Sequence, residues 1–137
     1  MKRILLSAIF AVLVCMSTFA QDSFKGQFFN QDLGITLTID FYEKSIPVPG
    51  LEDLEQCYGY LKGNINGSWI ILKVVKVEDN KALVRAASER GGDAQNLEFT
   101  VVGDEFIAFK QVDDTNIKGV EAKKYVKLPK LVEMRKM

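Results

Sequence analysis

The sequence predicts an all-β fold, a small eight-stranded antiparallel meander barrel, with a two-sheet sandwich as the alternative. Three observations lead to this prediction. Beyond residue 21, apolar and polar side chains alternate, which is the period of a half-buried strand. Turn residues such as Gly, Asn and Asp recur about every ten to twelve residues. Closure into a barrel would also remove the exposed strand edges that promote aggregation.

The N-terminal segment has the pattern of a secretory signal peptide, which we predict for residues 1–20. A Lys-Arg pair is followed by an apolar run and by the small residues Thr18 and Ala20, which suit a cleavage site. The run is shorter than the roughly 20 residues of a membrane-spanning helix, and a buried N-terminal helix is the alternative. A lipid anchor at Cys15 would need a small residue before it, where Val14 stands, so cleavage near Ala20 is the preferred alternative. We therefore expect no membrane anchor and a secreted or periplasmic domain over residues 21–137.

The charge balance argues against nucleic acid as a partner. The chain holds 18 basic and 18 acidic side chains, and loss of Lys2 and Arg3 with the leader leaves 16 against 18, a net charge near −2. Without a basic surplus the domain has little with which to neutralise phosphates. The mature length is that of one domain around one core, and we expect a monomer.

The first half of the domain holds the clearest strand, over residues 35–42. Its apolar face consists of Ile35, Leu37, Ile39 and Phe41, and its polar face of Thr36, Thr38, Asp40 and Tyr42. A strand over residues 24–30 precedes it through a tight turn. Strands over residues 57–65 and 68–78 then form a hairpin around Asn66-Gly67, the strongest short hairpin signal in the chain.

The second half continues the same pattern. An irregularity near Val74 and Val75 predicts a β-bulge that keeps one face of strand 68–78 directed inward. The remaining strands are predicted over residues 82–88, 97–102, 105–112 and 120–128. The tail, residues 130–137, is short and basic, and we expect it to be flexible and to fray.

One connection differs from the tight turns. Residues 43–55 form a loop far longer than the 2–5 residues of a common hairpin connection. Pro47 and Pro49 fix their own backbone angles and favour extended conformations in Ile46 and Val48. The sequence thus predicts a rigid, extended apolar segment at the rim of the barrel, which we call the proline loop. Its predicted partner-binding residues are Ile46, Pro47, Val48, Pro49, Gly50 and Leu51.

The residues after this loop add two expectations. Tyr58 and Tyr60 alternate with smaller or apolar neighbours, so they are expected to share a face and to flank the proline loop. Gly59 and Gly63 would let another segment of the chain approach closely. Cys57 is the single cysteine beyond the leader, so no internal disulfide is expected, and its thiol is either buried and inert or exposed and reactive.

The sequence offers no catalytic machinery. It contains no histidine, which excludes Ser-His-Asp and Cys-His arrangements and the usual zinc enzyme sites. Carboxylate pairs at residues 52–53 and 113–114 suit acid-base work or calcium, but solvated loop acids are the simpler interpretation. Gly91-Gly92 lacks the strand-to-helix context of a phosphate loop. We therefore predict a protein that is not an enzyme, with no cofactor and no metal.

Two binding functions remain. In its Ala-Gln leader end, mature length, strand pattern and lack of catalytic residues, the chain resembles the potempins, small exported all-β peptidase inhibitors of oral Bacteroidetes. The resemblance implies inhibition of secreted metallo- or serine peptidases, but it assigns no reactive residue. Within the proline loop, Val48 or Ile46 is expected to fill the specificity pocket of the peptidase. A rival loop would offer Arg90 to a trypsin-like enzyme.

The alternative function is that of a carrier. The segment from Lys25 to Phe28 resembles the Gly-x-Trp opening of the lipocalins, which are calycin barrels, with Phe in place of Trp. That resemblance implies transport of a small apolar ligand in the barrel interior. Many bulky side chains on inward faces leave little room for a ligand, so peptidase inhibition is the preferred expectation.

Overall fold

The computed structural model of the chain describes residues 23–53, 55–91, 93–112 and 117–137. The predicted leader lies outside these ranges. The described residues form strands and no helix, and so they contain no helix that could cross a membrane. The strands are β1 (Lys25–Asn30), β2 (Ile35–Asp40), β3 (Ile46–Pro47), β4 (Gln56–Cys57), β5 (Gly59–Gly63), β6 (Trp69–Val77), β7 (Lys81–Ser88), β8 (Ala94–Val101), β9 (Phe106–Gln111), β10 (Lys118–Glu121), β11 (Lys124–Lys127) and β12 (Val132–Lys136).

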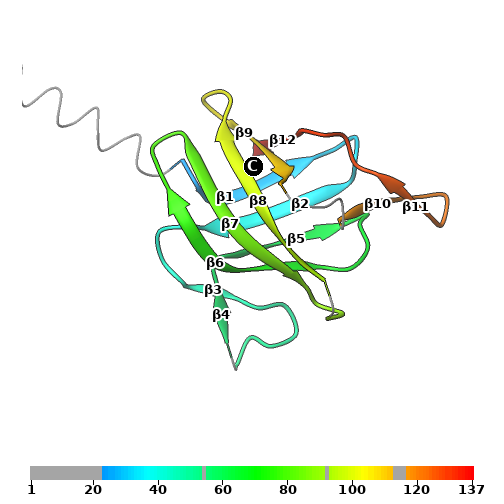
Figure 1. Cartoon of the computed structure of the whole chain (residues 1–137), viewed down its shortest axis with the longest axis horizontal. Coiled ribbons are helices and arrows are strands. Elements are labelled where there is room, and N and C mark those ends of the chain that lie inside the picture. The colour runs from blue at the N-terminus through cyan, green and yellow to red at the C-terminus, as the bar shows by residue number, and fades with distance from the viewer. Residues whose placement is uncertain (1–22, 54, 92, 113–116) are drawn as a thin grey trace, which may run out of the picture.

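Eight strands close an antiparallel barrel in the order β1-β12-β9-β8-β7-β6-β5-β2 (Figure 1). From β5 to β9, strands that are consecutive in the sequence are neighbours in the barrel, as in a meander. The hairpin β1–β2 then joins β12 on one side and β5 on the other. The predicted eight-stranded barrel is confirmed, and the two-sheet sandwich is not formed. The two-stranded sheets β3–β4 and β10–β11 lie outside the barrel.

The eighth barrel strand is not the predicted one. Residues 120–128, expected as one strand, belong largely to the hairpin β10–β11, which turns at Ala122 and Lys123. The barrel is closed instead by β12, which pairs with β9 and β1 and lies in the predicted flexible tail. Val132 and Met134 of β12 are 2% and 0% exposed. The prediction that the tail frays is therefore wrong, because alternate apolar residues dock it into the core.

The core fills the barrel with side chains from all eight of its strands. The predicted apolar face of β2 points inward, as does that of β8, so the period-two pattern is confirmed there. Four phenylalanine rings form a continuous chain of contacts in this core. Their centroids are 5.6 Å apart for Phe24 and Phe41, 5.1 Å for Phe41 and Phe99, and 5.6 Å for Phe99 and Phe109.

Strand β6 contains two bulges. Register shifts leave Leu72 and Val75 as extra residues in its ladder with β7, and they are 48% and 49% exposed. Between them Val74 stays opposite the fully buried Val84 and packs against the core. The predicted bulge near Val74 and Val75 is confirmed, and the bulge at Leu72 was not predicted.

The Asn66-Gly67 pair does not form a two-residue hairpin. The ladder between β5 and β6 ends where Leu61 faces Trp69, and residues 64–68, between the end of β5 and the start of β6, form a longer loop. The side chain of Asn66 accepts hydrogen bonds from Trp69 Nε1 over 3.3 Å and from the Lys118 backbone N–H over 2.9 Å. This loop therefore binds the first residue of β10.

Strand β5 runs close to β2, as its glycines predicted. A Cβ atom at Gly59 would collide with the carbonyl of Thr38, and one at Gly63 with the carbonyl of Gly34. The close approach expected at these two positions is confirmed.

Candidate functional site

The proline loop lies between β2 and β5, outside the barrel wall. Its two arms form the short sheet β3–β4, in which Ile46 is opposite Cys57 and Pro47 is opposite Gln56. Figure 1 shows this sheet next to β6, at the end of the barrel away from the turn between β8 and β9. The loop is thus attached by a ladder and is not a free extended segment.

A small apolar cluster fixes the proline loop to the outer side of β6. Val48, Cys57 and Ile70 are buried, and Ile46 and Tyr60 pack against them. Burial of a side chain such as valine stabilises a fold by about 1.5–3 kcal/mol, so Val48 is an anchor. The prediction that Val48 is displayed to a partner is wrong, because Ile70 offers it an apolar surface within the protein. Ile46 is partly buried because it packs against the same cluster.

The tip of the loop is a tight turn. The backbone N–H of Leu51 donates to the carbonyl of Val48 over 2.9 Å. Pro49 and Gly50 are the two central residues, and Gly50 has a φ of 84°, as the third position of a type II turn requires. Leu51 leaves this turn 45% exposed. The turn therefore presents one large apolar side chain from a defined backbone.

Acidic residues follow Leu51 in the loop. The backbone N–H of Gly50 donates to Oε1 of Glu52 over 3.1 Å. Hydrogen bonds from the backbone N–H groups of Glu52 itself and of Gly50 hold the pKa of this carboxyl below its usual range. Asp53 and Glu55 are also exposed. The tip therefore combines the exposed apolar side chain of Leu51 with exposed acidic side chains.

Asp40 fixes the entry to the loop. It is 4% exposed, and its Oδ1 accepts hydrogen bonds from the backbone N–H groups of Tyr42 and Glu43, each over 3.1 Å. Its Oδ2 lies 3.9 Å from Nζ of Lys25. The sequence interpretation placed Asp40 on the wet face of its strand and missed this role. An aspartate at the end of a strand, directly before a turn, is the signal that could have revealed it.

The two tyrosines do not share a face. Tyr60 packs against the cluster of Val48 and Ile70, beside the proline loop, whereas Tyr58 packs against the barrel core. The strand is interrupted between β4 and β5, where the Tyr58 carbonyl accepts from the Asp40 N–H over 2.8 Å. The alternation therefore does not continue through Tyr58, and only Tyr60 lies in the cluster that holds the loop.

Cys57 is a free thiol and is fully buried. Its Sγ lies 3.3 Å from the carbonyl oxygen of Gly59. Burial raises the pKa of this thiol, which disfavours the reactive thiolate. The interpretation of Cys57 as a buried residue is confirmed.

The other residues that the sequence suggested for metal or peptidase binding form no second site among the described residues. Within the described ranges no group of His, Cys, Asp and Glu side chains could hold a metal ion. The pair Asp113 and Asp114 lies outside the described residues. Arg90, the rival contact, donates from Nη1 to the hydroxyl of Tyr125 over 3.3 Å. The rival loop thus directs its arginine toward the hairpin β10–β11.

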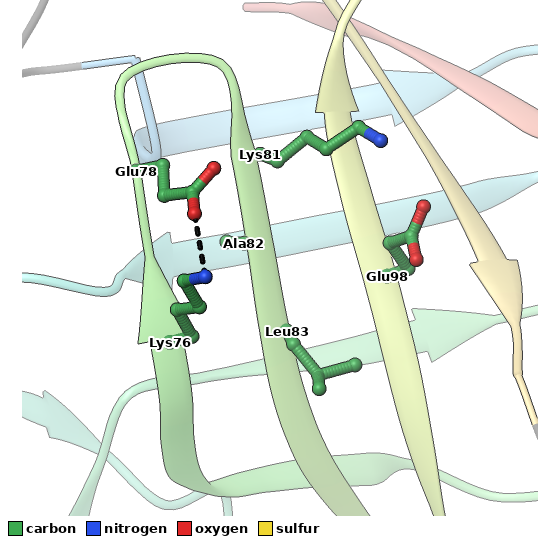
Figure 2. Close-up of a pocket in the computed structure, with 6 residues that line it drawn as sticks. All are labelled: Lys76, Glu78, Lys81, Ala82, Leu83 and Glu98. Atoms are coloured by element: carbon green, nitrogen blue, oxygen red, sulfur yellow. Dashed lines mark ion pairs between the residues drawn. The ribbon is translucent and has the colours of Figure 1, made fainter.

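A cleft of about 200 Å³ on the hairpin β6–β7 and the neighbouring β8 is lined by two lysines, two glutamates, Ala82 and Leu83 (Figure 2). Nζ of Lys76 lies 2.8 Å from Oε1 of Glu78, and this pair raises the pKa of the lysine and lowers the pKa of the glutamate. The lining has no net charge and offers no group that singles out a ligand. A second cleft, of about 290 Å³, lies where β1 meets β12 and is lined by residues such as Asp32 and Arg135.

Comparison with protein-family models, with curated proteins and with solved structures finds no match to this chain.

Proposed function

We propose that the domain is an exported inhibitor of extracellular peptidases and blocks an active-site cleft with the tip of the proline loop. The observation that carries this proposal is the link between Val48 and Leu51. Val48 is buried in the protein's own cluster, and the turn that begins at Val48 displays Leu51. A loop that is ordered before binding loses little conformational entropy in a complex. Such preorganisation is what a cleft-blocking loop needs.

Leu51, rather than Val48 or Ile46, is the side chain that we assign to the specificity pocket. An exposed leucine suits a metallo- or serine peptidase that prefers apolar residues. Peptidases bind substrates as extended strands, so the turn at Pro49 and Gly50 opposes productive cleavage. The exposed carboxylates of Glu52 and Asp53 favour a cleft with a positively charged rim.

The barrel interior supports an inhibitor over a carrier of apolar ligands. The chain of four phenylalanine rings occupies the space that a lipocalin-like carrier would use for its ligand. Trp69 and Leu61 are also almost fully buried in the same core. Entry of a ligand would require these side chains to repack.

The mature domain, residues 21–137, tests the proposal against a panel of secreted metallo-, serine and cysteine peptidases. We expect inhibition of at least one peptidase that cleaves beside apolar residues. Replacement of residues 51–53 by Ser-Gly-Ser keeps the anchor Val48 and should abolish inhibition while the far-ultraviolet spectrum stays unchanged. Native mass spectrometry of the same sample tests the carrier. A co-purified ligand with no inhibition would overturn the proposal in favour of a carrier.

A further inference from the structure

The hairpin β10–β11 projects from the barrel, apart from the proline loop (Figure 1). Its ladder places Lys118 opposite Lys127, Gly119 opposite Val126, Val120 opposite Tyr125 and Glu121 opposite Lys124. The outer edge of β10 is covered by the loop that follows β5. The Val120 N–H donates to the carbonyl of Asn64 over 2.8 Å, and the Asn66 N–H donates to the carbonyl of Lys118 over 3.0 Å.

Among the described residues, β11 has β10 on one side and no strand on its outer edge. In an antiparallel ladder, residues alternate between those that bond the partner strand and those whose backbone groups point away from it. The hydrogen bonds at the β10 edge show that the backbone groups of Lys118 and Val120 point away from β11. Their cross-strand partners, Lys127 and Tyr125, therefore direct their N–H and C=O groups away from β10. Within the part of the chain that the structure describes, no strand pairs with this edge.

The same hairpin is strongly basic, although the mature chain as a whole is slightly acidic. Residues 118–127 contain four lysines and one glutamate. No ion pair between described residues involves any of these lysines. Lys118 and Lys127 face each other directly, a like-charge pair that destabilises a ladder. Tyr125 lies next to them, 58% exposed, and Arg90 bonds its hydroxyl.

We propose that the open edge of β11 binds an extended acidic peptide from a protein partner as an added strand. Backbone groups of Tyr125 and Lys127 would supply the ladder, and the lysines would pair with carboxylates of the peptide. A peptide strand facing Lys124, Tyr125, Val126 and Lys127 would read acidic, apolar, apolar, acidic. The binding of this peptide is independent of the proposed peptidase inhibition, because the hairpin and the proline loop are separate surfaces.

A simpler role for the lysines is protection, because edge lysines prevent strands from pairing with other chains. That role does not require two lysines to face each other across a ladder, whereas a carboxylate bound between them would offset their repulsion. A bound acidic strand also satisfies the open backbone groups, which an anionic polysaccharide would not do. The backbone edge therefore favours a peptide.

The probe is the peptide acetyl-Ser-Glu-Val-Val-Glu-Ser-amide, titrated into the ¹⁵N-labelled mature domain. We expect saturable shifts of the Tyr125 and Lys127 amide signals, and weaker binding at high salt because exposed charges are screened. The matched control peptide carries lysines in place of both glutamates and should not bind. The variant Lys124→Glu/Lys127→Glu should prefer the lysine peptide over the acidic peptide. Its affinity for the acidic peptide should be about tenfold lower than that of the wild type.

Tyr125→Pro separates a strand from a purely ionic contact. Proline removes the outward N–H of residue 125 but no bond to β10, so the hairpin should remain, as the Gly119 and Val126 amide signals report. We expect at least about a tenfold loss of peptide affinity for Tyr125→Pro and a smaller loss for Tyr125→Ala, which keeps the N–H.

Either of two results would overturn the proposal. One is the absence of saturable shifts with the acidic peptide, which would leave the lysines in a protective role. The other is equal binding of the acidic peptide to the wild type and to Tyr125→Pro. Tight binding of heparin that Tyr125→Pro leaves unchanged, together with no peptide binding, would assign the surface to an anionic polysaccharide instead.

Discussion

The backbone N–H of Leu51 bonds the carbonyl of Val48 over 2.9 Å, and this bond joins a buried residue to a displayed one. Val48 is 6% exposed and Leu51 is 45% exposed. The four residues of one turn thus connect the anchoring cluster on β6 to the surface that we assign to the peptidase. Any change that loosens the anchor should therefore weaken inhibition without touching the contact surface.

Val48→Ala tests the anchor. Loss of two buried methyl groups should lower the free energy of unfolding by about 1–3 kcal/mol and loosen the turn, so inhibition should weaken as well. Chemical denaturation and hydrogen exchange of the Leu51 amide measure the two effects. Val102→Ala is the control, because Val102 is 44% exposed and should change stability little. Unchanged exchange at Leu51 would show that the cluster does not hold the turn.

Gly50→Ala tests the turn itself. A methyl group at Gly50 meets no atom within 4 Å, so its cost comes from the positive φ alone, about 1 kcal/mol. Gly91→Ala is a matched control with a φ of 76° and equally open surroundings. Both variants should lose similar stability, but only Gly50→Ala should lose inhibition. Equal inhibition constants for the two variants would contradict the role of the turn.

The pKa of Glu52 predicts how the loop responds to acid. The folded loop lowers the pKa of Glu52. The ionised carboxylate therefore contributes fully to loop order above the usual glutamate pKa of about 4.3. This contribution is lost as the pH falls through the lower pKa of the folded state. The amide signal of Gly50 should therefore shift below about pH 4. Glu52→Gln should remove this transition, and a transition that persists in the variant would have to be assigned to another group.

Cys57 should resist thiol reagents in the folded domain. Its burial and raised pKa keep it protonated and out of contact with solvent. Reaction with dithiobis(nitrobenzoic acid) at mildly alkaline pH should be slow, and it should become fast and stoichiometric in denaturant. Rapid labelling under native conditions would show that the loop opens readily, against the preorganisation that we propose.

Deletion of residues 130–137 should unfold the domain, since it removes β12 and opens the barrel between β9 and β1. Deletion of Met137 alone removes one backbone bond, to Gln27, and should leave the fold intact. Circular dichroism during thermal unfolding compares the two truncations. A cooperative transition in the longer deletion would mean that β12 is dispensable.

The sequence predicted those elements in which local pattern and tertiary role agree. Strand β2 alternates cleanly, so its inward face could be predicted. The hairpin β10–β11 was missed because its turn residues, Ala122 and Lys123, carry no turn signal although both have positive φ. Strand β12 was missed because Val132 and Met134 give a single apolar alternation in a short segment that is otherwise largely charged.

The site was predicted in outline, as the proline loop, but not in its details. Prolines and length marked residues 46–51 as a rigid connection. The burial of Val48 depends on Ile70, an apolar residue on the outer face of β6, and such a contact between distant segments leaves no local pattern. Leu51 therefore emerged as the displayed side chain only from the structure.

The most direct test of the account compares two aspartate substitutions at equally exposed apolar residues. Leu51→Asp changes the displayed tip, whereas Val102→Asp changes the turn at the opposite end of the barrel (Figure 1). Against a peptidase that the wild type inhibits, Leu51→Asp should raise the inhibition constant by at least about 30-fold, and Val102→Asp by less than about twofold. Equal inhibition by Leu51→Asp and the wild type would contradict the assignment of the proline loop as the inhibitory surface.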